Sequence, residues 1–492
     1  MTNHDTSTDT DTTNIKTDPF LTALDEKVQR VFGDLSIDKR RLPATKLDKR
    51  GIPAYVAEWA IDTIVPNRGE LSQENISKIL EWSNKFIPGP EEAKVIQNRL
   101  LNGETIKVLT SMEVDIKLTR NKQERVAQLK LLQISDAIIA DGIVDKYHDL
   151  LKQGMWGVVE LSNGPDGVAV VSFKPMQATF DLNLFKQSRK MFTLKEWMAL
   201  LVTSMGYDPN YFSEEEQILV LCRLLPLVQK SMHLIELAPK GTGKSYFFEN
   251  ISSRVRLVSG GNISPAVLFV NNASGQWGLL ARYKVVVLDE VQTLKFEKPE
   301  EIVGGLKGFL ANSRLTRGGL HESSSDCGLV MLANILLDSN QNPIESPLLK
   351  DLPDFLQETA FLDRIKGIIP GWKTKKLSPD SFAKNVGLKA DFFGDALLAF
   401  RDDLVIDQFC SQKIKLKGKK YKRNDDAVQS IASGMMKLLF PDGVVSNEDF
   451  FHYCISPAIQ LRQLIWNQLQ MLDAEYRQYD NLIESEFPQL DE

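Results

Sequence analysis

The sequence is poor in several features that would mark particular classes of protein. Its 492 residues hold four cysteines, far apart and with no C-x-x-C pair, so they predict neither a disulfide framework nor a zinc site. No apolar run approaches the roughly 18 residues that a membrane-spanning helix needs. The 59 basic and 65 acidic residues leave a net charge of −6, which excludes a generic polycationic coat for nucleic acid but not a local basic patch.

The first 19 residues lack an apolar core as well, and they hold seven threonines and four aspartates. We therefore expect residues 1–19 to form a disordered tail rather than a secretory signal. Elsewhere the chain has enough apolar residues, 43 % overall, to bury a sizeable core. The sequence predicts a cytoplasmic protein without a membrane partner.

Changes in hydrophobic periodicity predict five further segments. Residues 20–104 show apolar residues at helical spacing and predict a helical N-terminal domain. Short β-branched or alternating runs predict a small β-rich, OB-like domain over residues 105–190. These runs are Ile106–Leu109, Val114–Leu118, Ala127–Leu132, Gly157–Leu161 and Val168–Phe173. Residues 191–372 predict an α/β core, residues 373–445 a helical lid, and residues 446–492 a helical segment with an acidic tail.

The α/β core is predicted from four apolar runs that alternate with longer, helix-compatible segments. The runs are Met232–Leu237, Val255–Ser259, Val285–Leu288 and Leu329–Asn334. Such alternation is typical of a parallel sheet covered by helices on both faces. The predicted fold class is therefore α/β, with a helical lid after the core and a helical and barrel-like region before it.

The most specific motif is Ala238–Ser245, which follows the first of these strands and opens a predicted helix. It matches the phosphate-loop pattern G-x-x-x-x-G-K-S except that Ala238 replaces the first glycine. Backbone N–H groups at a helix start bind phosphates, Lys244 would reach the β- and γ-phosphates of ATP, and Ser245 would ligate Mg²⁺. The predicted nucleotide contacts are Pro239, Lys240, Gly241, Thr242, Gly243, Lys244 and Ser245. The alternative is a chance Gly-Lys-Ser sequence in a turn.

Two later strands end in polar residues that complete such a site. Asp289 and Glu290 close the run V-V-V-L-D-E, and Asp289 lies 45 residues after Lys244. Asp289 would hold Mg²⁺ and Glu290 would polarise the attacking water. Asn334 ends the next strand and would orient that water beside the γ-phosphate, although an asparagine also commonly turns the chain after a strand. Together the motifs predict Mg²⁺-dependent ATP hydrolysis.

Two arginines are candidates for sensing the nucleotide. Arg364, in F-L-D-R-I, is a candidate arginine finger that would stabilise charge on the γ-phosphate of a neighbouring subunit. Arg423, at the start of a predicted helix over Asp425–Leu439, would report nucleotide state from the lid. A surface ion pair is the commoner fate of a single arginine.

A family resemblance rests on the combination of these motifs. The P-K-G-T-G-K-S loop, the D-E strand, the strand ending at Asn334, F-L-D-R-I followed by I-P-G-W, and A-S-G at residues 432–434 resemble the Lon-like ATPase of BREX bacteriophage-exclusion systems. The resemblance implies an AAA+ core, a ring-shaped hexamer, single or doubled, DNA association, and phage defence alongside other defence proteins. The ring also resembles that of minichromosome-maintenance helicases.

Long members of this family carry a C-terminal Lon-type protease domain with a Ser–Lys dyad. Here a helical segment and an acidic tail follow Arg462, and no serine there stands in a glycine-rich nucleophile context. Since a serine nucleophile needs a base within reach, we expect no peptidase activity.

The substrate of the ring is open between DNA and protein. Arg314 and Arg317 lie in a predicted glycine hairpin and would face DNA phosphates, or form ion pairs between subunits. Seven basic residues over Lys413–Arg423, and a second cluster over Lys39–Arg50, are further candidates, although such runs are often solvated loops. A protein-threading unfoldase would need a gripping loop, for which Trp277 is the candidate unless it packs in the core. A nucleotide-gated DNA-binding scaffold is the third alternative.

Overall fold

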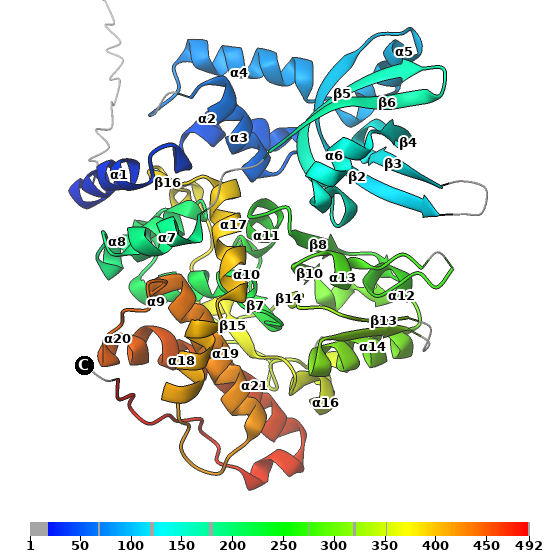
Figure 1. Ribbon diagram of the computed structural model, residues 1–492. Helices are drawn as coiled ribbons and strands as arrows, with labels where there is room; N and C mark the ends of the chain where they lie inside the picture. Colours follow the sequence, from blue (N-terminus) through cyan, green and yellow to red (C-terminus); the bar gives the residue numbers. More distant parts are fainter. Residues whose placement is uncertain are drawn as a thin grey trace, which may run out of the picture.

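The computed structural model describes residues 18–66, 69–118, 123–176, 181–273, 275–317, 321–350 and 352–490. The predicted disordered tail therefore lies outside the described residues, apart from Asp18 and Pro19. Helix α1 (Pro19–Phe32) begins there, and the Asp18 carboxylate caps it by accepting the N–H of Phe20 at 2.9 Å. Figure 1 shows the N-terminal helices and barrel at the top, the parallel sheet in the middle and the C-terminal helices below.

Helices form the N-terminal region before residue 105. Residues 42–87 pack around their own apolar cluster, whereas the first helix packs into the main core and the last one against the barrel. The helices are α1, α2 (Arg41–Thr45), α3 (Ala54–Ile64), α4 (Gln73–Phe86) and α5 (Ala93–Leu101). A short strand, β1 (Ser36–Asp38), pairs antiparallel with β16 (Val386–Leu388) and so joins this region to the chain beyond the central parallel sheet. The buried ion pair between Lys39 and Glu58 lies at the same junction.

Five strands close into a barrel in the order β2-β3-β4-β6-β5, which confirms the predicted barrel-like region. They are β2 (Ile106–Leu118), β3 (Gln123–Leu129), β4 (Ile134–Ile139), β5 (Met155–Gly164) and β6 (Gly167–Pro175). Two predicted runs, Ile106–Leu109 and Val114–Leu118, are one continuous strand, because the polar residues between them stay in register with β5 and β3. Strand β4 was missed by sequence reasoning.

The central sheet has five parallel strands in the order β15-β7-β14-β10-β8. They are β15 (Gly367–Pro370), β7 (Leu234–Ala238), β14 (Gly328–Asn334), β10 (Val285–Asp289) and β8 (Val255–Ser259). The three inner strands are buried almost throughout, as apolar parallel strands covered on both faces should be. Each predicted strand of the core is present, with ends shifted by up to two residues. Edge strand β15 was missed because it has only four residues and ends in proline.

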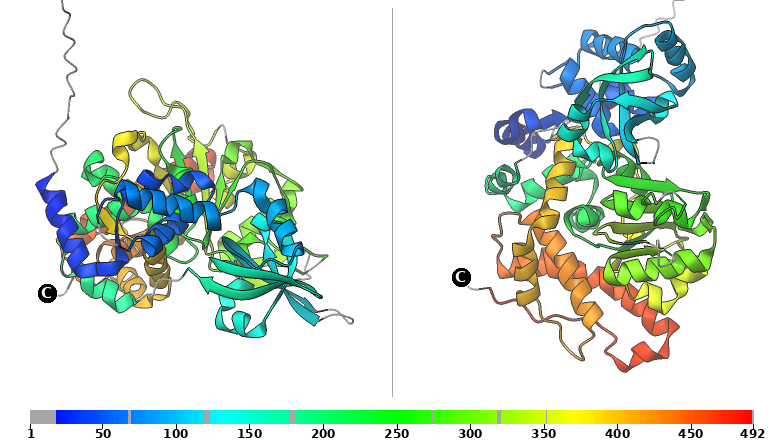
Figure 2. Two further views of the ribbon diagram at one scale, coloured as in Figure 1. Left: turned by 90° about the horizontal axis from the view of Figure 1, so that it is seen from above. Right: turned by 45° about the vertical axis from the view of Figure 1, so that its right-hand side comes forward.

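Helices cover the sheet and form the region after it, as the two views of Figure 2 show. Those before and within the core are α7 (Leu182–Arg189), α8 (Leu194–Ser204), α9 (Glu214–Leu221), α10 (Leu225–Val228), α11 (Lys244–Asn250), α12 (Pro265–Leu268), α13 (Leu279–Arg282), α14 (Pro299–Asn312), α15 (Asp354–Gln357) and α16 (Thr359–Leu362). Those after it are α17 (Ala390–Ala399), α18 (Leu404–Lys413), α19 (Lys422–Leu439), α20 (Asn447–Asp449) and α21 (Ser456–Leu472). None of the helices in the described ranges is long and apolar enough to cross a bilayer.

Candidate nucleotide-binding site

The segment between β7 and α11 forms a tight loop at the carboxyl edge of the sheet. Gly241 and Gly243 adopt left-handed conformations, with φ of +87° and +73°, and α11 starts at Lys244. A Cβ atom on Gly243 would collide with Leu377 and would lie 2.9 Å from the hydroxyl of Tyr207. Left-handed residues that alternate with ordinary ones turn successive N–H groups to one side and create an anion-binding concavity at the helix start.

Lys244 lies under this loop and contacts the end of a neighbouring strand. Its ammonium donates to Asn334 Oδ1 at 2.8 Å, and its side chain is largely buried. Strand pairing explains the contact, since Asn334 at the end of β14 is in register with Ala238 at the end of β7. Burial lowers the pKa of Lys244, while the charges of Glu236 and Asp289 act in the opposite direction. The structure thus brings together two residues that the sequence predicted for one site.

Asp289 and Glu290 follow β10 at the same edge of the sheet. Asp289 is buried and its Oδ1 accepts the N–H of Glu290 at 2.8 Å. Glu290 is exposed and has a left-handed backbone, with φ 49° and ψ 48°. A strained conformation of a non-glycine residue is often retained where function requires it.

Oxygen donors suitable for Mg²⁺ come from two elements of this edge. The hydroxyl of Ser245 lies in the first turn of α11, and the carboxylate of Asp289 ends β10. Mg²⁺ prefers few protein ligands of this type and keeps several waters or phosphate oxygens. The donor set therefore fits a Mg²⁺–nucleotide complex.

A buried ion pair behind the loop was missed by sequence reasoning. Glu236, inside β7, accepts from the guanidinium of Arg223 at distances from 2.6 to 3.1 Å, and both side chains are almost fully buried. A signal for it was present, because a carboxylate in the middle of the apolar run L-I-E-L-A requires a buried partner. The sequence could not identify Arg223 as that partner.

Arg364 and Arg423 do not lie at the loop of their own chain. Arg364 precedes β15, whose first residue pairs with Leu234 at the start of β7. Strand β7 extends about 13 Å from there to the loop, so Arg364 is at the opposite edge of the sheet. Arg423 binds the carboxylate of Asp363, next to Arg364 in the chain. Both assignments stay predictions, and within one chain neither arginine lies at the phosphate loop.

Asp363 is the centre of a buried cluster that includes Arg423. Its side chain is buried and also accepts from Arg462 at 2.9 Å and from the hydroxyl of Tyr421 at 2.5 Å. Arg462 is itself fully buried and donates to the carbonyl of Ile365 at 2.6 Å. The cluster therefore ties the segment that carries Arg364 to α19 and α21.

The candidate DNA contacts are in different environments. Arg314 starts β12 (Arg314–Arg317), which pairs antiparallel with β13 (His321–Ser324) as the predicted hairpin. Its guanidinium lies 3.3 Å from Glu322, and both side chains are about two-thirds exposed. The side chain of Arg317 is outside the described part of the structure.

Two other basic runs are partly engaged within the chain. In the N-terminal cluster, Lys39 is paired with Glu58, and buried Arg41 donates to the carbonyl of Val65 at 2.5 Å. The loop that contains Lys415–Lys420 lies against residues 480–486, with Lys417 N–H donating to the carbonyl of Glu484 at 2.8 Å. Lys39 and Arg41 therefore have structural roles. The lysine side chains of residues 415–420 are exposed, which agrees with the solvated-loop interpretation.

Trp277, the candidate gripping residue of an unfoldase, is partly buried against the main core and pairs through its backbone with Val270. The packing interpretation of this residue agrees with its position.

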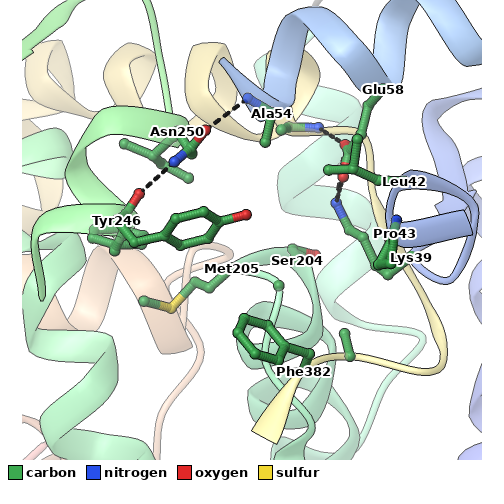
Figure 3. Close-up of a pocket in the computed structure, with 15 residues that line it drawn as sticks. Lys39, Leu42, Pro43, Ala54, Glu58, Ser204, Met205, Tyr246, Asn250 and Phe382 are labelled. Carbon is green, nitrogen blue, oxygen red and sulfur yellow. Dashed lines mark hydrogen bonds and ion pairs between the residues drawn. The ribbon is translucent and has the colours of Figure 1, made fainter. Parts of the chain in front are cut away.

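The N-terminal region reaches the helix that follows the phosphate loop. Asn250, at the end of α11, accepts the N–H of Ala54 at 2.7 Å and donates to the carbonyl of Tyr246 at 2.7 Å. Figure 3 shows these residues around a pocket between the two parts, with Tyr246 and Phe382 beside it. Helix α11, whose N-terminus would bind the phosphates, is therefore in direct contact with the N-terminal region.

The loop, the lysine, the acidic pair and the asparagine at one edge of a parallel sheet define a P-loop ATPase core. Comparison with known proteins identifies the family. Residues 168–481 match the family described as Lon-like protease BrxL-like, ATPase domain, and residues 30–163 match BREX system Lon protease-like protein BrxL N-terminal. The chain belongs to the BrxL family, which confirms the resemblance inferred from the motifs.

Two relatives show how much of such a protein the chain covers. The Lon-like protease BrxL of Escherichia coli O9:H4 (strain HS) is 29 % identical over 473 residues, which are 91 % of this chain and 66 % of the relative. The Lon-like protease BrxL of Bacillus cereus (strain H3081.97) is 28 % identical over 424 residues, which are 83 % of this chain and 62 % of the relative. The chain thus spans somewhat less than two thirds of each relative.

Proposed function

We propose that the chain is a Mg²⁺-dependent ATPase that assembles into a ring and binds or translocates DNA in phage defence, in the cytoplasm and together with other defence proteins. The observation that carries the proposal is the convergence of Lys244, Asn334 and Asp289 at the carboxyl edge of one sheet, beside a loop with two left-handed glycines. The match to an ATPase domain supports ATP as the nucleotide.

Each residue has a defined task in this proposal. Lys244 leaves the amide of Asn334 and binds the β- and γ-phosphates, which frees Asn334 to hold the attacking water. Ser245 and Asp289 hold Mg²⁺, which neutralises phosphate charge when it is bound. Glu290, exposed at the end of β10, accepts a proton from the water.

The position of Arg364 supports a ring. Because Arg364 lies at the sheet edge opposite its own loop, it can act as an arginine finger only on the nucleotide of a neighbouring subunit. Arg423 pairs with Asp363, the residue before Arg364, and would approach the same neighbouring nucleotide. A hexamer, single or doubled, is the assembly that we propose.

DNA is the preferred substrate because the β12–β13 hairpin presents Arg314 to solvent in a weak, exposed ion pair that phosphates can replace. Trp277 is engaged with the core, which argues against the unfoldase alternative. A scaffold that binds DNA without stimulated turnover is the second candidate, favoured by the extended contacts between the N-terminal region and the core.

The ATPase rate measured with duplex DNA, single-stranded DNA and an unfolded protein tests the proposal. Stimulation by DNA supports it, stimulation by protein alone overturns the DNA assignment, and DNA binding without stimulation supports the scaffold. Arg314→Gln should weaken DNA binding and reduce the slope of log K against log salt concentration by about one. The matched control is Arg99→Gln, which removes another exposed arginine that pairs with a glutamate, Glu104.

We also propose that these 492 residues have no protease activity. After Arg462 the sequence holds a single serine, Ser485, and its buried hydroxyl has no hydrogen-bond partner among the described residues. A nucleophilic serine needs a base within hydrogen-bond reach. Cleavage of an unfolded protein by the purified chain, lost on Ser485→Ala, would contradict this.

A further inference from the structure

Three consecutive carbonyl groups of the phosphate loop each accept a hydrogen bond from outside the loop. Gly241 O accepts from the N–H of Leu377 at 2.8 Å, and Thr242 O accepts from Arg223 Nη2 at 3.2 Å. Gly243 O accepts from the hydroxyl of Tyr207 at 3.4 Å, in addition to the first backbone bond of α11. The donors come from three segments that are distant in sequence.

Arg223, the charged one of these donors, is held rigidly. Arg223 uses its Nε and Nη2 atoms on the carboxylate of Glu236, and Nη2 also reaches Thr242 O, so one guanidinium links strand β7 to the loop that follows it. Both charges are almost fully buried, which allows few other arrangements. Gly371 makes room for this pair, because a Cβ atom there would lie 3.0 Å from Glu236 Oε1.

Tyr207 is the second side-chain donor and is fixed by its packing. It is buried, its ring lies edge-on to that of Phe212, and its backbone pairs with Phe382. The hydroxyl lies against Gly243, where any side chain would displace it. The contact between the Tyr207 hydroxyl and the loop is therefore fixed by the packing of this buried residue.

The geometry of a peptide group gives these contacts a consequence for the other side of the loop. In a trans peptide group the C=O and the N–H point in opposite directions. Donors that hold the loop carbonyls toward the protein interior therefore leave the N–H groups of the same peptide units directed outward. Dipoles fixed before the ligand arrives bind charge more favourably than dipoles that must first reorient.

We propose that Arg223 and Tyr207 are positioning residues that hold the carbonyl groups of the loop in place and so preorganise its N–H groups for the phosphates of ATP. The inference rests on the proposed nucleotide site and identifies the residues that hold its loop in place. Motif reasoning does not reveal these residues. Neither residue touches the nucleotide in this account, because both lie on the far side of the loop.

The test is the affinity for Mg²⁺–ATP of two variants, measured by titration with a fluorescent ATP analogue. Tyr207→Phe removes one hydroxyl, and Arg223→Lys keeps the buried charge but loses the fork that links Glu236 to Thr242. Each should raise Kd about two- to tenfold, the effect of one lost hydrogen bond. Because Lys244 and Glu290 are unchanged, kcat at saturating ATP should stay within about twofold of wild type.

Tyr453→Phe is the matched control, since it removes a hydroxyl that donates to Glu214 at 2.6 Å, away from the loop. Wild-type Kd in both Tyr207→Phe and Arg223→Lys, with only a lower melting temperature, would overturn the positioning role. If Arg223→Lys does not fold, Tyr207→Phe decides alone. Failure of the wild type to bind Mg²⁺–ATP would instead refute the proposed function, so the two failures are distinct.

Discussion

Glu290 combines a predicted catalytic role with a strained backbone, and the two can be separated by substitution. Its φ of 49° and ψ of 48° lie in the left-handed region, and no hydrogen bond or ion pair of its side chain is found among the described residues. Glu290→Gln removes the base and keeps the strain. Glu290→Gly removes both.

The sizes of the two effects follow from this geometry. The left-handed conformation of a residue with a Cβ atom destabilises the folded state by about 1–2 kcal/mol, and glycine removes this strain. The greater freedom of glycine in the unfolded chain offsets about 0.5–1 kcal/mol of that gain. We therefore expect Glu290→Gly to raise the free energy of unfolding by about 1 kcal/mol and Glu290→Gln to leave it unchanged. Loss of a general base should lower turnover about 100- to 10,000-fold in both, with ATP still bound.

Phosphate release and denaturant unfolding measure the two quantities on the same preparations. Glu300→Gln, which makes the same charge change at an exposed residue in the first turn of α14, is the control and should match the wild type in turnover. Turnover of Glu290→Gln within about threefold of wild type would refute the role of the base. Equal stability of the Gln and Gly variants would refute the strain argument.

Further predictions concern the ring, the metal and pH. Arg364→Ala and Lys244→Ala should each be inactive alone, yet mixed rings should recover up to about a quarter of wild-type turnover, because some interfaces then have both residues intact; no recovery on mixing would argue against a finger supplied by a neighbour. Removal of Mg²⁺ with EDTA should abolish turnover, and full activity in EDTA would exclude the metal role of Ser245 and Asp289. Burial raises the pKa of Asp395 from 3.8 to about 6, so its stabilising contribution is complete below pH 4 and is lost as the pH rises through 6. Asp395→Asn should therefore raise the free energy of unfolding by up to about 3 kcal/mol at pH 8 but not at pH 4, whereas exposed Asp380→Asn should change neither value.

Local motifs in the sequence were enough to predict which residues lie together at the carboxyl edge of the sheet. The loop over Ala238–Ser245 and the acidic pair Asp289–Glu290 each depend on residues that are neighbours in the chain, and their strands have the apolar character of buried parallel strands. Asn334 could be placed because it ends a strand of the same sheet.

The parts that sequence reasoning missed depend on contacts between distant segments. The partner of Glu236 is Arg223, and the support of Gly243 is Tyr207, 36 residues earlier. Arg423 pairs with Asp363, 60 residues away in the sequence, and does not contact the loop. Periodicity and motifs report local conformation, whereas such pairs are decided by how the elements pack.

The central claim is that the edge of the parallel sheet binds and cleaves Mg²⁺–ATP. The most direct measurement is phosphate release by the purified chain with ATP and Mg²⁺, beside Lys244→Ala as the matched variant. We predict steady turnover in the wild type and none in the variant. A wild type that neither binds nor hydrolyses ATP, or a Lys244→Ala variant as active as the wild type, would contradict the account.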